Sequence, residues 1–286
     1  MDRGFIMKVK DVMSNEVIVI GQNEHVSHAR NLMLKHGLSR VIVVDKDENP
    51  IGIVTEKDLA RKLRGSGPAW KRRPIDKISI RRIMSSNIHT IDADEDVKNA
   101  VEIMIRNKIS SVPVMDSEGL AGIITKTDLM KFYISKYAGK WKVSNLMTRD
   151  VVTVNQNHTL SHVIRLMDEN KIYGLVVMFD NEIAGIITPA DISFARVDDP
   201  ETGVSVERIY FVKQLAEGGD KRKAKDVSML TAGDIMSKNF VQISPDSDAV
   251  EAAKLMSDKG TGYIPVVNRE DLVGIITRTD VIKGIQ

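Results

Sequence analysis

The sequence contains the stretch Gly122-Ile-Ile-Thr-Lys-Thr-Asp128, and three close variants of it occur elsewhere along the 286 residues. Each variant has a glycine, two aliphatic residues, a threonine, two variable residues and an aspartate. The other three are Gly52-Ile-Val-Thr-Glu-Lys-Asp58, Gly185-Ile-Ile-Thr-Pro-Ala-Asp191 and Gly274-Ile-Ile-Thr-Arg-Thr-Asp280. Recurrence of a seven-residue pattern indicates an internal repeat, which has to be recognised before the fold is interpreted.

A methionine precedes each of these stretches at a nearly constant distance. The separations from methionine to glycine are 39, 38, 38 and 38 residues (52−13, 122−84, 185−147 and 274−236). The four methionines are Met13, Met84, Met147 and Met236. We therefore read the chain as four copies, repeats 1 to 4, of one unit of roughly 55 to 60 residues.

Each repeat predicts the same order of elements, β-α-β-β-α. In repeat 1, a β-branched stretch at 17–20 predicts a strand. Apolar residues at helical spacing from Val26 to Met33 predict an amphipathic helix. Two further strands, 40–45 and 51–54, are joined by a turn, and a second helix begins at Thr-x-x-Asp58. The first strands of the other repeats are expected at 88–91, 151–154 and 240–243. One such mixed α/β repeat buries too little surface to be stable alone, so pairing is expected.

The spacing of the repeats predicts how they are grouped. Successive methionines lie 71, 63 and 89 residues apart, so the longest connection falls between repeats 3 and 4, where residues 206–216 could add a helix. We expect repeat 1 to pair with 2 and repeat 3 with 4, each about a pseudo-two-fold axis, with the boundary between the pairs at 137–143. The expected domain bounds are 8–64, 78–136, 142–197 and 231–286.

Composition excludes several classes of protein. Hydrophobic residues make up 42% of the chain and charged residues 28%, which is typical of a soluble globular protein. The chain has no cysteine, which excludes disulfides and thiolate metal sites, and no apolar run approaches the roughly 18 residues that span a bilayer. A net charge of +2 provides no general attraction to nucleic acid or membrane, so neither is expected as a partner. The expected location is the cytoplasm.

The repeat resembles the CBS domain, named after cystathionine β-synthase. The resemblance rests on the entry Lys10-Asp-Val-Met13, the segment Lys108-Ile-Ser-Ser-Val-Pro-Val114 and the four Gly-Ile-Ile-Thr-x-x-Asp stretches. Two CBS units in tandem form a Bateman module. Four units with little else are similar to the gamma subunit of AMP-activated protein kinase and its stand-alone archaeal relatives. The resemblance implies two Bateman modules forming a disk, with adenosyl ligands (AMP, ADP, ATP or S-adenosylmethionine) bound in clefts between paired units.

The resemblance also assigns roles to individual residues. Ribose contacts fall to the motif aspartates, Asp58, Asp128, Asp191 and Asp280. Phosphate-side contacts fall to Thr55, Thr125, Thr188, Thr277 and, at the start of a middle strand, the basic Arg40. The positions equivalent to Arg40 in the other repeats are Ser111, Gly174 and Tyr263, so only repeat 1 keeps a basic residue there. Weaker contacts with the base or ribose fall to Thr90 and Thr153.

The Thr-x-x-Asp motif also has a purely structural explanation. Threonine at a helix N-cap can accept a hydrogen bond from the backbone N–H near the aspartate, and the aspartate favours the helix dipole. The motif glycines equally permit close approach of the backbone, either to a neighbouring repeat or to a base.

Two classes of function stay open. The first is a non-catalytic sensor of cellular energy state that binds adenine nucleotides or S-adenosylmethionine and regulates an unidentified protein partner. The alternative is a structural interaction platform whose ligand clefts are vestigial, and a homodimer is compatible with either. No Ser/His/Asp set, paired carboxylates or Walker-type loop is present, so no catalytic residues, catalytic cofactor or enzymatic activity is expected. His158 and His162 have the spacing of a metal pair, but no third ligand accompanies them, so no metal is expected.

Overall fold

The computed structural model describes residues 7–56, 58–59, 77–188, 191–192, 196–198, 205–207 and 230–286. The chain divides into two compact units. The first comprises Met1–Lys142, Asp248–Gly260 and Thr277–Gln286, and the second comprises Val143–Ser247 and Thr261–Ile276. One boundary between the units, at residues 142 and 143, lies within the range 137–143, but the units do not coincide with the two expected pairs of repeats, because the first unit includes parts of repeat 4.

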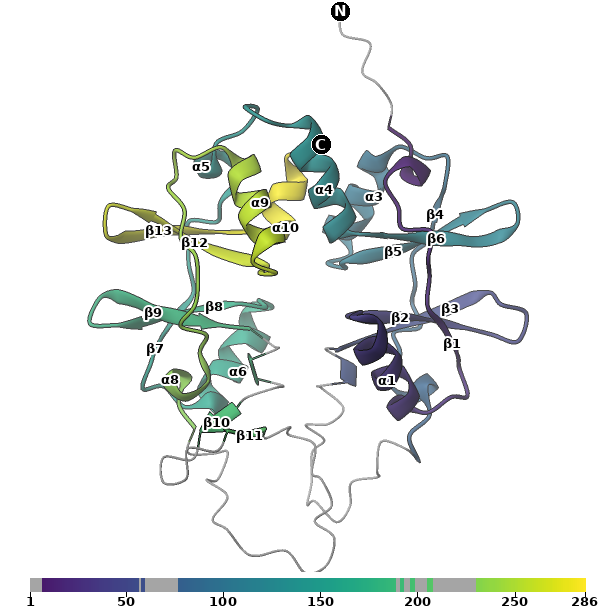
Figure 1. The fold of residues 1–286 in the computed structure, drawn as a ribbon, viewed down its shortest axis with the longest axis horizontal. Coiled ribbons are helices and arrows are strands. Elements are labelled where there is room, and N and C mark those ends of the chain that lie inside the picture. Colours follow the sequence, from purple (N-terminus) through teal and green to yellow (C-terminus); the bar gives the residue numbers. More distant parts are fainter. Residues whose placement is uncertain are drawn as a thin grey trace, which may run out of the picture. The chain divides into compact units, whose positions relative to one another are not determined.

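Repeat 1 has the predicted element order over its described residues (Figure 1). After a short 3-10 helix, η1 (Val9–Asp11), come β1 (Val19–Gly21), α1 (Val26–His36), β2 (Arg40–Val44) and β3 (Pro50–Thr55). Strand β1 is parallel to β2, whereas β2 and β3 form an antiparallel hairpin. Helix α1 ends at Gly37, whose φ of 62° is the left-handed conformation that glycine adopts without a steric penalty.

The other repeats follow the same plan. Repeat 2 contains η4 (Ile80–Arg82), β4 (Ile91–Asp92), α3 (Val97–Arg106), β5 (Ser111–Asp116), β6 (Gly119–Thr125) and α4 (Lys126–Lys136). Repeat 3 contains α5 (Val143–Leu146), β7 (Thr153–Asn155), α6 (Leu160–Asn170), β8 (Leu175–Phe179) and β9 (Glu182–Ile187). Repeat 4 contains α8 (Ala232–Ile235), α9 (Ala249–Asp258), β12 (Tyr263–Asn268), β13 (Asp271–Thr277) and α10 (Arg278–Lys283). In repeats 1 and 3, most of the range in which the sequence predicts a second helix lies outside the described residues.

The first strand of each repeat is where the sequence prediction was least accurate. Strands β1, β4 and β7 begin two or three residues later than expected and have at most three residues. In repeat 4 the strand is reduced to one bridge between Ile243 and Val266. The aliphatic β-branched residues that precede these strands are partly exposed, because the first strand pairs only with the end of the middle strand. Ile18 still accepts a backbone hydrogen bond from the Ile42 N–H, at 3.3 Å.

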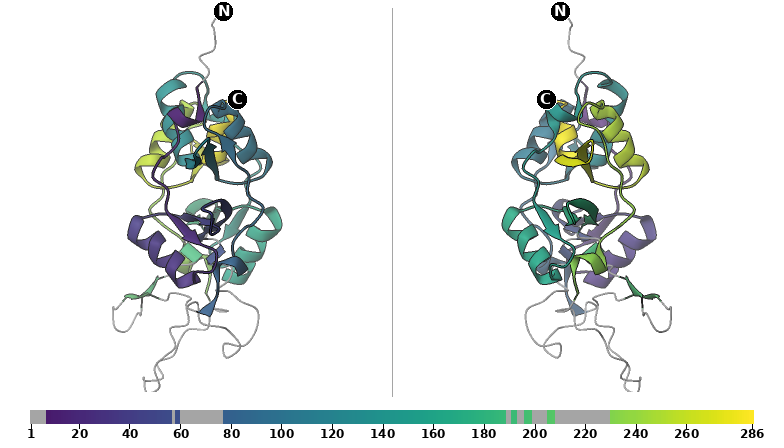
Figure 2. Two further views of the ribbon diagram at one scale, coloured as in Figure 1. Left: turned by 90° about the vertical axis from the view of Figure 1, so that its right-hand side faces the viewer. Right: turned by 90° about the vertical axis from the view of Figure 1, so that its left-hand side faces the viewer.

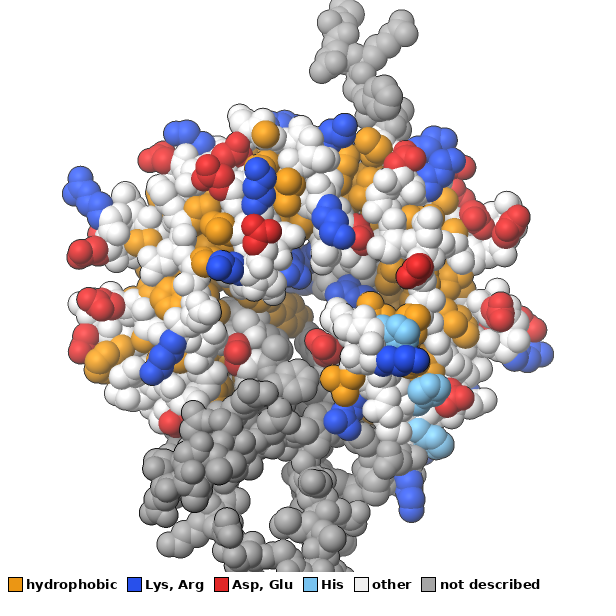
Figure 3. All heavy atoms as spheres, in the orientation of Figure 1, with side chains coloured by type: hydrophobic (Ala, Val, Ile, Leu, Met, Phe, Trp, Pro, Cys, Tyr) orange, Lys and Arg blue, Asp and Glu red, His pale blue; other side chains and the backbone are white. Residues whose placement is uncertain are grey.

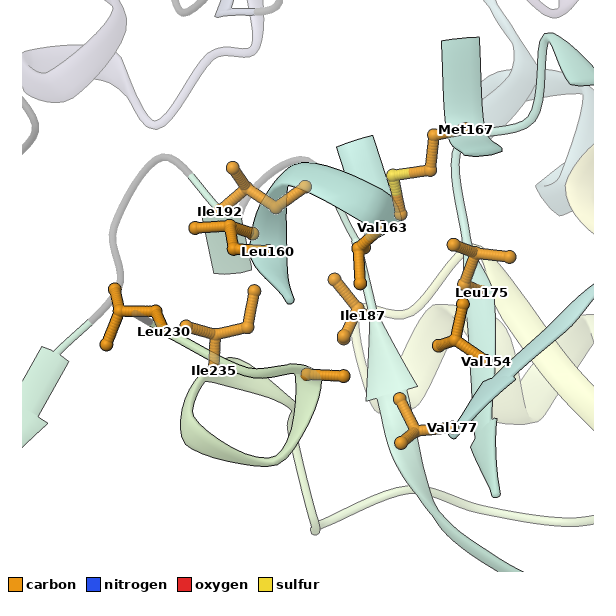
Figure 4. Packing of buried hydrophobic residues seen from close by; sticks show 11 residues of the cluster. Val154, Leu160, Val163, Met167, Leu175, Val177, Ile187, Ile192, Leu230 and Ile235 are labelled. Carbon is orange, nitrogen blue, oxygen red and sulfur yellow. The ribbon is translucent and has the colours of Figure 1, made fainter. Parts of the chain in front are cut away.

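The apolar face of the first helix packs on the sheet of its own repeat, as the helical spacing predicts. In repeat 3, Leu160, Val163 and Met167 of α6 lie against Leu175 and Ile187 of the strands (Figure 4). Repeat 1 buries the equivalent set, with Val26, Ala29 and Met33 no more than 4% exposed. Figure 2 shows the same helix-on-sheet layering from the side. Burial of these side chains is the main source of stability within each repeat.

The methionines and glycines that define the repeat meet across each pair of repeats. Ser14, after Met13 of repeat 1, bridges to Ile123 of repeat 2, and Ser85 of repeat 2 bridges back to Ile53 of repeat 1. Repeats 3 and 4 make the same reciprocal bridges, Thr148 to Ile275 and Ser237 to Ile186. This reciprocity confirms the predicted pairing of repeat 1 with 2 and of 3 with 4. It also shows that the motif glycines allow the backbone of the paired repeat to approach closely.

Replacing Gly122 with alanine is expected to destabilise the first unit. A Cβ atom at this position would lie 2.7 Å from the Ser14 carbonyl oxygen and 2.8 Å from the Met13 sulfur, and the backbone oxygen has little freedom to move. Overpacking of this kind costs about 1 to 3 kcal/mol of unfolding free energy, measurable by denaturant titration. Gly21→Ala is the matched control, because its Cβ would meet only Glu24 Cγ, at 3.8 Å. Equal stabilities of the two variants would contradict the close packing.

The helices of repeat 4 belong to the first unit, which the sequence did not predict. Helices α9 and α10 pack against α4, and Val281, Ile282 and Ile285 are almost completely buried (Figure 1). The chain after α10 is held by two aromatic side chains, since Tyr137 Oη donates to Ile285 O and Trp141 Nε1 donates to Gly284 O, both at 3.1 Å. Repeats 3 and 4 are therefore paired through their strands, while the helices of repeat 4 bury their apolar faces on repeat 2.

The connection between repeats 3 and 4 differs from the expected helix where it is described. Strands β10 (Arg196–Asp198) and β11 (Ser205–Glu207) pair in antiparallel fashion, so the helix expected at 206–216 is wrong at its first two residues. The rest of that range lies outside the described residues. Among the helices that the structure describes, none is long and apolar enough to cross a bilayer.

Candidate functional site

The Thr-x-x-Asp motif forms a capping box in all four repeats. In repeat 2, Asp128 Oδ2 accepts from the Thr125 N–H at 2.9 Å and from the Thr125 hydroxyl at 2.6 Å. The Asp128 N–H in turn donates to Thr125 Oγ1 at 3.3 Å. The other three boxes repeat this geometry, with hydroxyl-to-carboxylate distances of 2.6 to 2.7 Å. The structural explanation of the motif, a helix cap, is therefore confirmed.

The capping boxes restrict what the threonines can do. A threonine hydroxyl has one hydrogen, and each of Thr55, Thr125, Thr188 and Thr277 directs it at its own aspartate. A phosphate placed beside these boxes would therefore receive no hydrogen bond from the hydroxyls unless they rotate. The phosphate-side role of the threonines stays a prediction.

The second carboxylate oxygen of the aspartates faces away from the box. Asp128 Oδ1 accepts from Ser14 Oγ at 3.1 Å, and Asp280 Oδ1 is 2.9 Å from Lys283 Nζ. Asp58, Asp128 and Asp280 are only 9%, 8% and 4% exposed, and Asp191 is half-buried. The ribose role predicted for these four residues would have to use Oδ1, because Oδ2 accepts two bonds within the box.

Arg40 begins strand β2 and lies directly opposite Thr55 in the β2–β3 hairpin. Its Nη1 donates to the carbonyl and hydroxyl oxygens of Ser110, in repeat 2, at 2.9 and 3.1 Å, and its Nη2 donates to Ser39 Oγ at 2.9 Å. Burial lowers the pKa of Arg40, and the nearby Arg278 lowers it further, although Asp128 and Glu56 oppose this effect. Arg40 is thus held between repeats 1 and 2, beside the box of each.

Three more basic residues lie near Arg40 or near its neighbour Lys126. Lys126 Nζ donates to Thr279 Oγ1 at 2.7 Å, which joins the first turn of α4 to that of α10. Burial lowers the pKa of Lys126 to about 8, and the neighbouring Arg40, Lys283 and Arg278 contribute in the same direction, opposed by Asp280. We call Arg40, Lys126, Arg278 and Lys283 the basic cluster. All four belong to the first unit but come from three repeats.

Replacing Lys126 with methionine is expected to raise the stability of the ligand-free protein. The folded state lowers the pKa of Lys126 from 10.5 to about 8, so burying the charged form is unfavourable. An apolar side chain of similar volume removes this penalty and stabilises by roughly 1 kcal/mol or more, measured by denaturant unfolding at pH 7.

The same pKa defines a pH dependence for the wild type. Between pH 8 and 10.5 the unfolded state binds more protons than the folded state, so the contribution of Lys126 to stability rises with pH across this window. Lys131→Met, on the exposed side of α4, is the control and should change stability by less than about 0.5 kcal/mol. Loss of stability in Lys126→Met with no effect in the control would show that Lys126 is a structural residue.

Sequence reasoning missed three members of the basic cluster. Lys126 and Arg278 occupy the first variable position of Thr-x-x-Asp in repeats 2 and 4. A basic residue at this position is the signal that could have identified them, because the first turn of the helix places it beside the box. Lys283 carries no such signal, since only the fold of α10 brings its ammonium group to Asp280.

The other positions equivalent to Arg40 carry no cation. Ser111 is buried, and the ring of Tyr263 lies against Gly174, where a Cβ would come within 2.7 Å of it. Thr153 begins β7 and Thr90 directly precedes β4; both are exposed, and their predicted contact with a base or ribose stays untested.

The remaining candidate groups do not assemble into a site. The rings of His158 and His162 are in contact, with centroids 4.6 Å apart, but no group of three potential ligands that could hold a metal occurs within the described ranges. An open cavity in the first unit contains Asp45, at the end of β2 away from Arg40, and none of the predicted site residues. Acidic and basic side chains are interspersed on the face shown in Figure 3.

Comparison with known proteins gives a consistent assignment. Protein MJ1225 of Methanocaldococcus jannaschii is 23% identical over 299 residues, which is 98% of this chain and 99% of that protein. A crystal structure of MJ1225, a candidate archaeal homologue of g-AMPK, matches with a TM-score of 0.77 at 21% identity over 98% of this chain and 100% of that one. A conserved protein of Pyrococcus horikoshii matches with a TM-score of 0.67 at 18% identity, covering 98% and 100% of the two chains.

A shorter match is closer in sequence. Protein MJ1404 of Methanocaldococcus jannaschii is 32% identical over 132 residues, which is 44% of this chain. The matched part is 31% of that protein, so this chain spans about a third of the length of that relative. The CBS domain model matches residues 9–65, 80–135, 143–198 and 232–286, which together are well over half of the sequence. The chain therefore belongs to the CBS-domain family.

Proposed function

We propose that this protein is a non-catalytic regulatory sensor that binds adenosyl ligands and signals to a protein partner. Phosphorylated ligands, AMP, ADP or ATP, are preferred to S-adenosylmethionine at the first pair of repeats. The observation that carries the proposal is the basic cluster beside the Thr-x-x-Asp boxes.

Four like charges near one another, of which Arg40, Lys126 and Arg278 are partly buried, favour an anionic ligand. The pKa of Lys126 is lowered to about 8 and that of Arg40 is also lowered, so the cluster is electrostatically unfavourable when empty. An anion bound among these groups would gain charge-assisted hydrogen bonds and relieve their mutual repulsion. The first turn of α4 adds the positive end of the helix dipole.

The proposed placement of the ligand follows from the box geometry. The Oδ1 oxygens of the motif aspartates would accept hydrogen bonds from ribose. Asp128 and Asp280 lie near the cluster, because the charge of Asp128 acts on Arg40 and that of Asp280 acts on Lys126. The phosphates would lie among Arg40, Lys126 and Arg278, with the boxes keeping their threonine hydroxyls. A nucleotide held in this way would connect repeats 1, 2 and 4, because the cluster draws on all three.

This connection provides a means of signalling. Helices α4 and α10 are joined at their N-terminal ends by the bond from Lys126 to Thr279 and farther along by the aromatic contacts of Tyr137 and Trp141. A phosphate that neutralises the basic cluster would stabilise this pair of helices. A partner protein that binds the two helices in this arrangement would then respond to the nucleotide concentration. Sensing of cellular energy state is the corresponding biological role.

Thermal unfolding with added ligand tests the proposal. A ligand that binds only the folded state raises the unfolding temperature. At a free concentration of 100 times its Kd, it adds about 2.7 kcal/mol to the free energy of unfolding. We expect AMP, ADP or ATP to stabilise more than adenosine or S-adenosylmethionine, and Lys126→Met to remove most of the difference. If none of these ligands at millimolar concentration changes the unfolding temperature, the alternative of an interaction platform with vestigial clefts is supported instead.

A further inference from the structure

The residue after each repeat methionine carries a hydroxyl group: Ser14, Ser85, Thr148 and Ser237. In every repeat this residue forms a bridge to the last strand of the paired repeat, immediately before the capping box. For Ser14 the bridge consists of two backbone hydrogen bonds with Ile123, both 2.9 Å long. Each repeat therefore places one hydroxyl-bearing residue beside the capping box of the repeat with which it pairs.

In repeat 2 the delivered hydroxyl contacts the predicted ribose carboxylate. Ser14 Oγ donates to Asp128 Oδ1 at 3.1 Å, while Oδ2 accepts both hydrogen bonds from Thr125. A carboxylate can accept about four hydrogen bonds, so three of the four positions on Asp128 are occupied. By itself, the Asp128 carboxylate can therefore accept one further hydrogen bond.

A ribose diol presents two neighbouring donors, and the serine hydroxyl supplies the second acceptor. The hydroxyl oxygen has two lone pairs that remain available when its hydrogen points at Asp128. Its hydrogen-bonded distance from Oδ1, 3.1 Å, is of the order of the spacing between two vicinal hydroxyl oxygens. Ser14 is exposed and Asp128 is 8% exposed, so the serine lies on the solvent side of the pair.

We infer that Ser14 of repeat 1 completes the ribose site of repeat 2, with Asp128 Oδ1 accepting one ribose hydroxyl and Ser14 Oγ accepting the other. The inference rests on the proposed function, and it makes the site a property of the pair rather than of one repeat. The bridge between the repeats then sets the distance between the two acceptors, so any shift of one repeat against the other changes ribose affinity.

Ser14→Ala, compared with ligands that lack one ribose hydroxyl, tests the inference. Calorimetric titration with AMP, 2′-deoxy-AMP and 3′-deoxy-AMP should show that the variant binds AMP about 3- to 10-fold more weakly, the effect of one neutral hydrogen bond. One of the two deoxy ligands should bind wild type with a similar loss and should lose nothing further in Ser14→Ala. The affected sites are those that Asp128→Asn also weakens.

Two control variants distinguish binding from structure. Ser14→Thr, which copies the residue found in repeat 3, should restore AMP affinity to within about twofold of wild type, below the effect of one hydrogen bond. Ser135→Ala removes a hydroxyl that donates to Phe132 O on the exposed side of α4 and should leave affinity unchanged. Equal weakening of all three ligands in Ser14→Ala, or no weakening, would overturn the inference while leaving the proposed function intact. If wild type binds none of the three, both fail.

Discussion

Arg40→Ala is expected to weaken binding of AMP and ATP by about 10- to 150-fold while changing adenosine affinity much less. The lost contact is a charge-assisted hydrogen bond to phosphate, worth about 1.5 to 3 kcal/mol. Adenosine has no phosphate, so it should report only indirect effects. Isothermal titration of both ligands to wild type and variant measures the difference.

The structure adds a second role for Arg40 that the experiment has to separate. Its guanidinium also donates to Ser110 of repeat 2, so the variant leaves a carbonyl group without that donor and should lose some stability. Arg40→Lys keeps the charge without the planar fork and should fall between wild type and alanine for AMP. Arg106→Ala, which removes an arginine paired with Glu102 on the exposed side of α3, should alter neither affinity. An equal loss for AMP and adenosine would mean that Arg40 acts only in packing between repeats 1 and 2.

Asp128→Asn should separate the capping and ribose roles of the motif aspartate. An amide has one acceptor oxygen, which can keep the bonds from Thr125 only by turning its NH2 group toward Ser14 and the ligand. Unfolding free energy should therefore fall by no more than about 1 kcal/mol, whereas AMP affinity at this site should fall about 10- to 150-fold. Denaturant unfolding without ligand and calorimetric titration with AMP give the two values.

Asp96→Asn is the matched control for this prediction. Asp96 caps α3 by accepting the Lys98 N–H at 2.8 Å, and it lies outside every Thr-x-x-Asp box. It should show a comparable loss of stability with unchanged AMP affinity. If Asp128→Asn behaves in the same way, Asp128 is a helix cap and repeat 2 has no ribose site.

The repeat, its element order and its pairing were predictable from the sequence because they depend on local patterns. The constant spacing of Met13 to Gly52 and its equivalents marks the repeat, and each of these methionines packs on the glycine of the paired repeat, as Met13 does on Gly122. Helical spacing in Val26 to Met33 marks a buried face. The capping boxes were predictable for the same reason, since Thr125 and Asp128 are three residues apart and form their bonds within one turn. The short first strands were poorly predicted, because β-branched residues favour strands whether or not a partner is available.

The basic cluster was decided by tertiary structure. Lys126 and Thr279 are 153 residues apart, and Arg40 meets Ser110 across 70 residues, so no local pattern connects them. Lys126 and Thr279 come together because α9 and α10 of repeat 4 bury their apolar faces on α4 of repeat 2, whereas Arg40 meets Ser110 because repeats 1 and 2 pair. The lowered pKa of Lys126 follows from this burial beside other cations and could not be read from its neighbours in sequence. The sequence by itself determined the four repeats and their caps, and apolar packing between helices of different repeats determined which charges gather beside them.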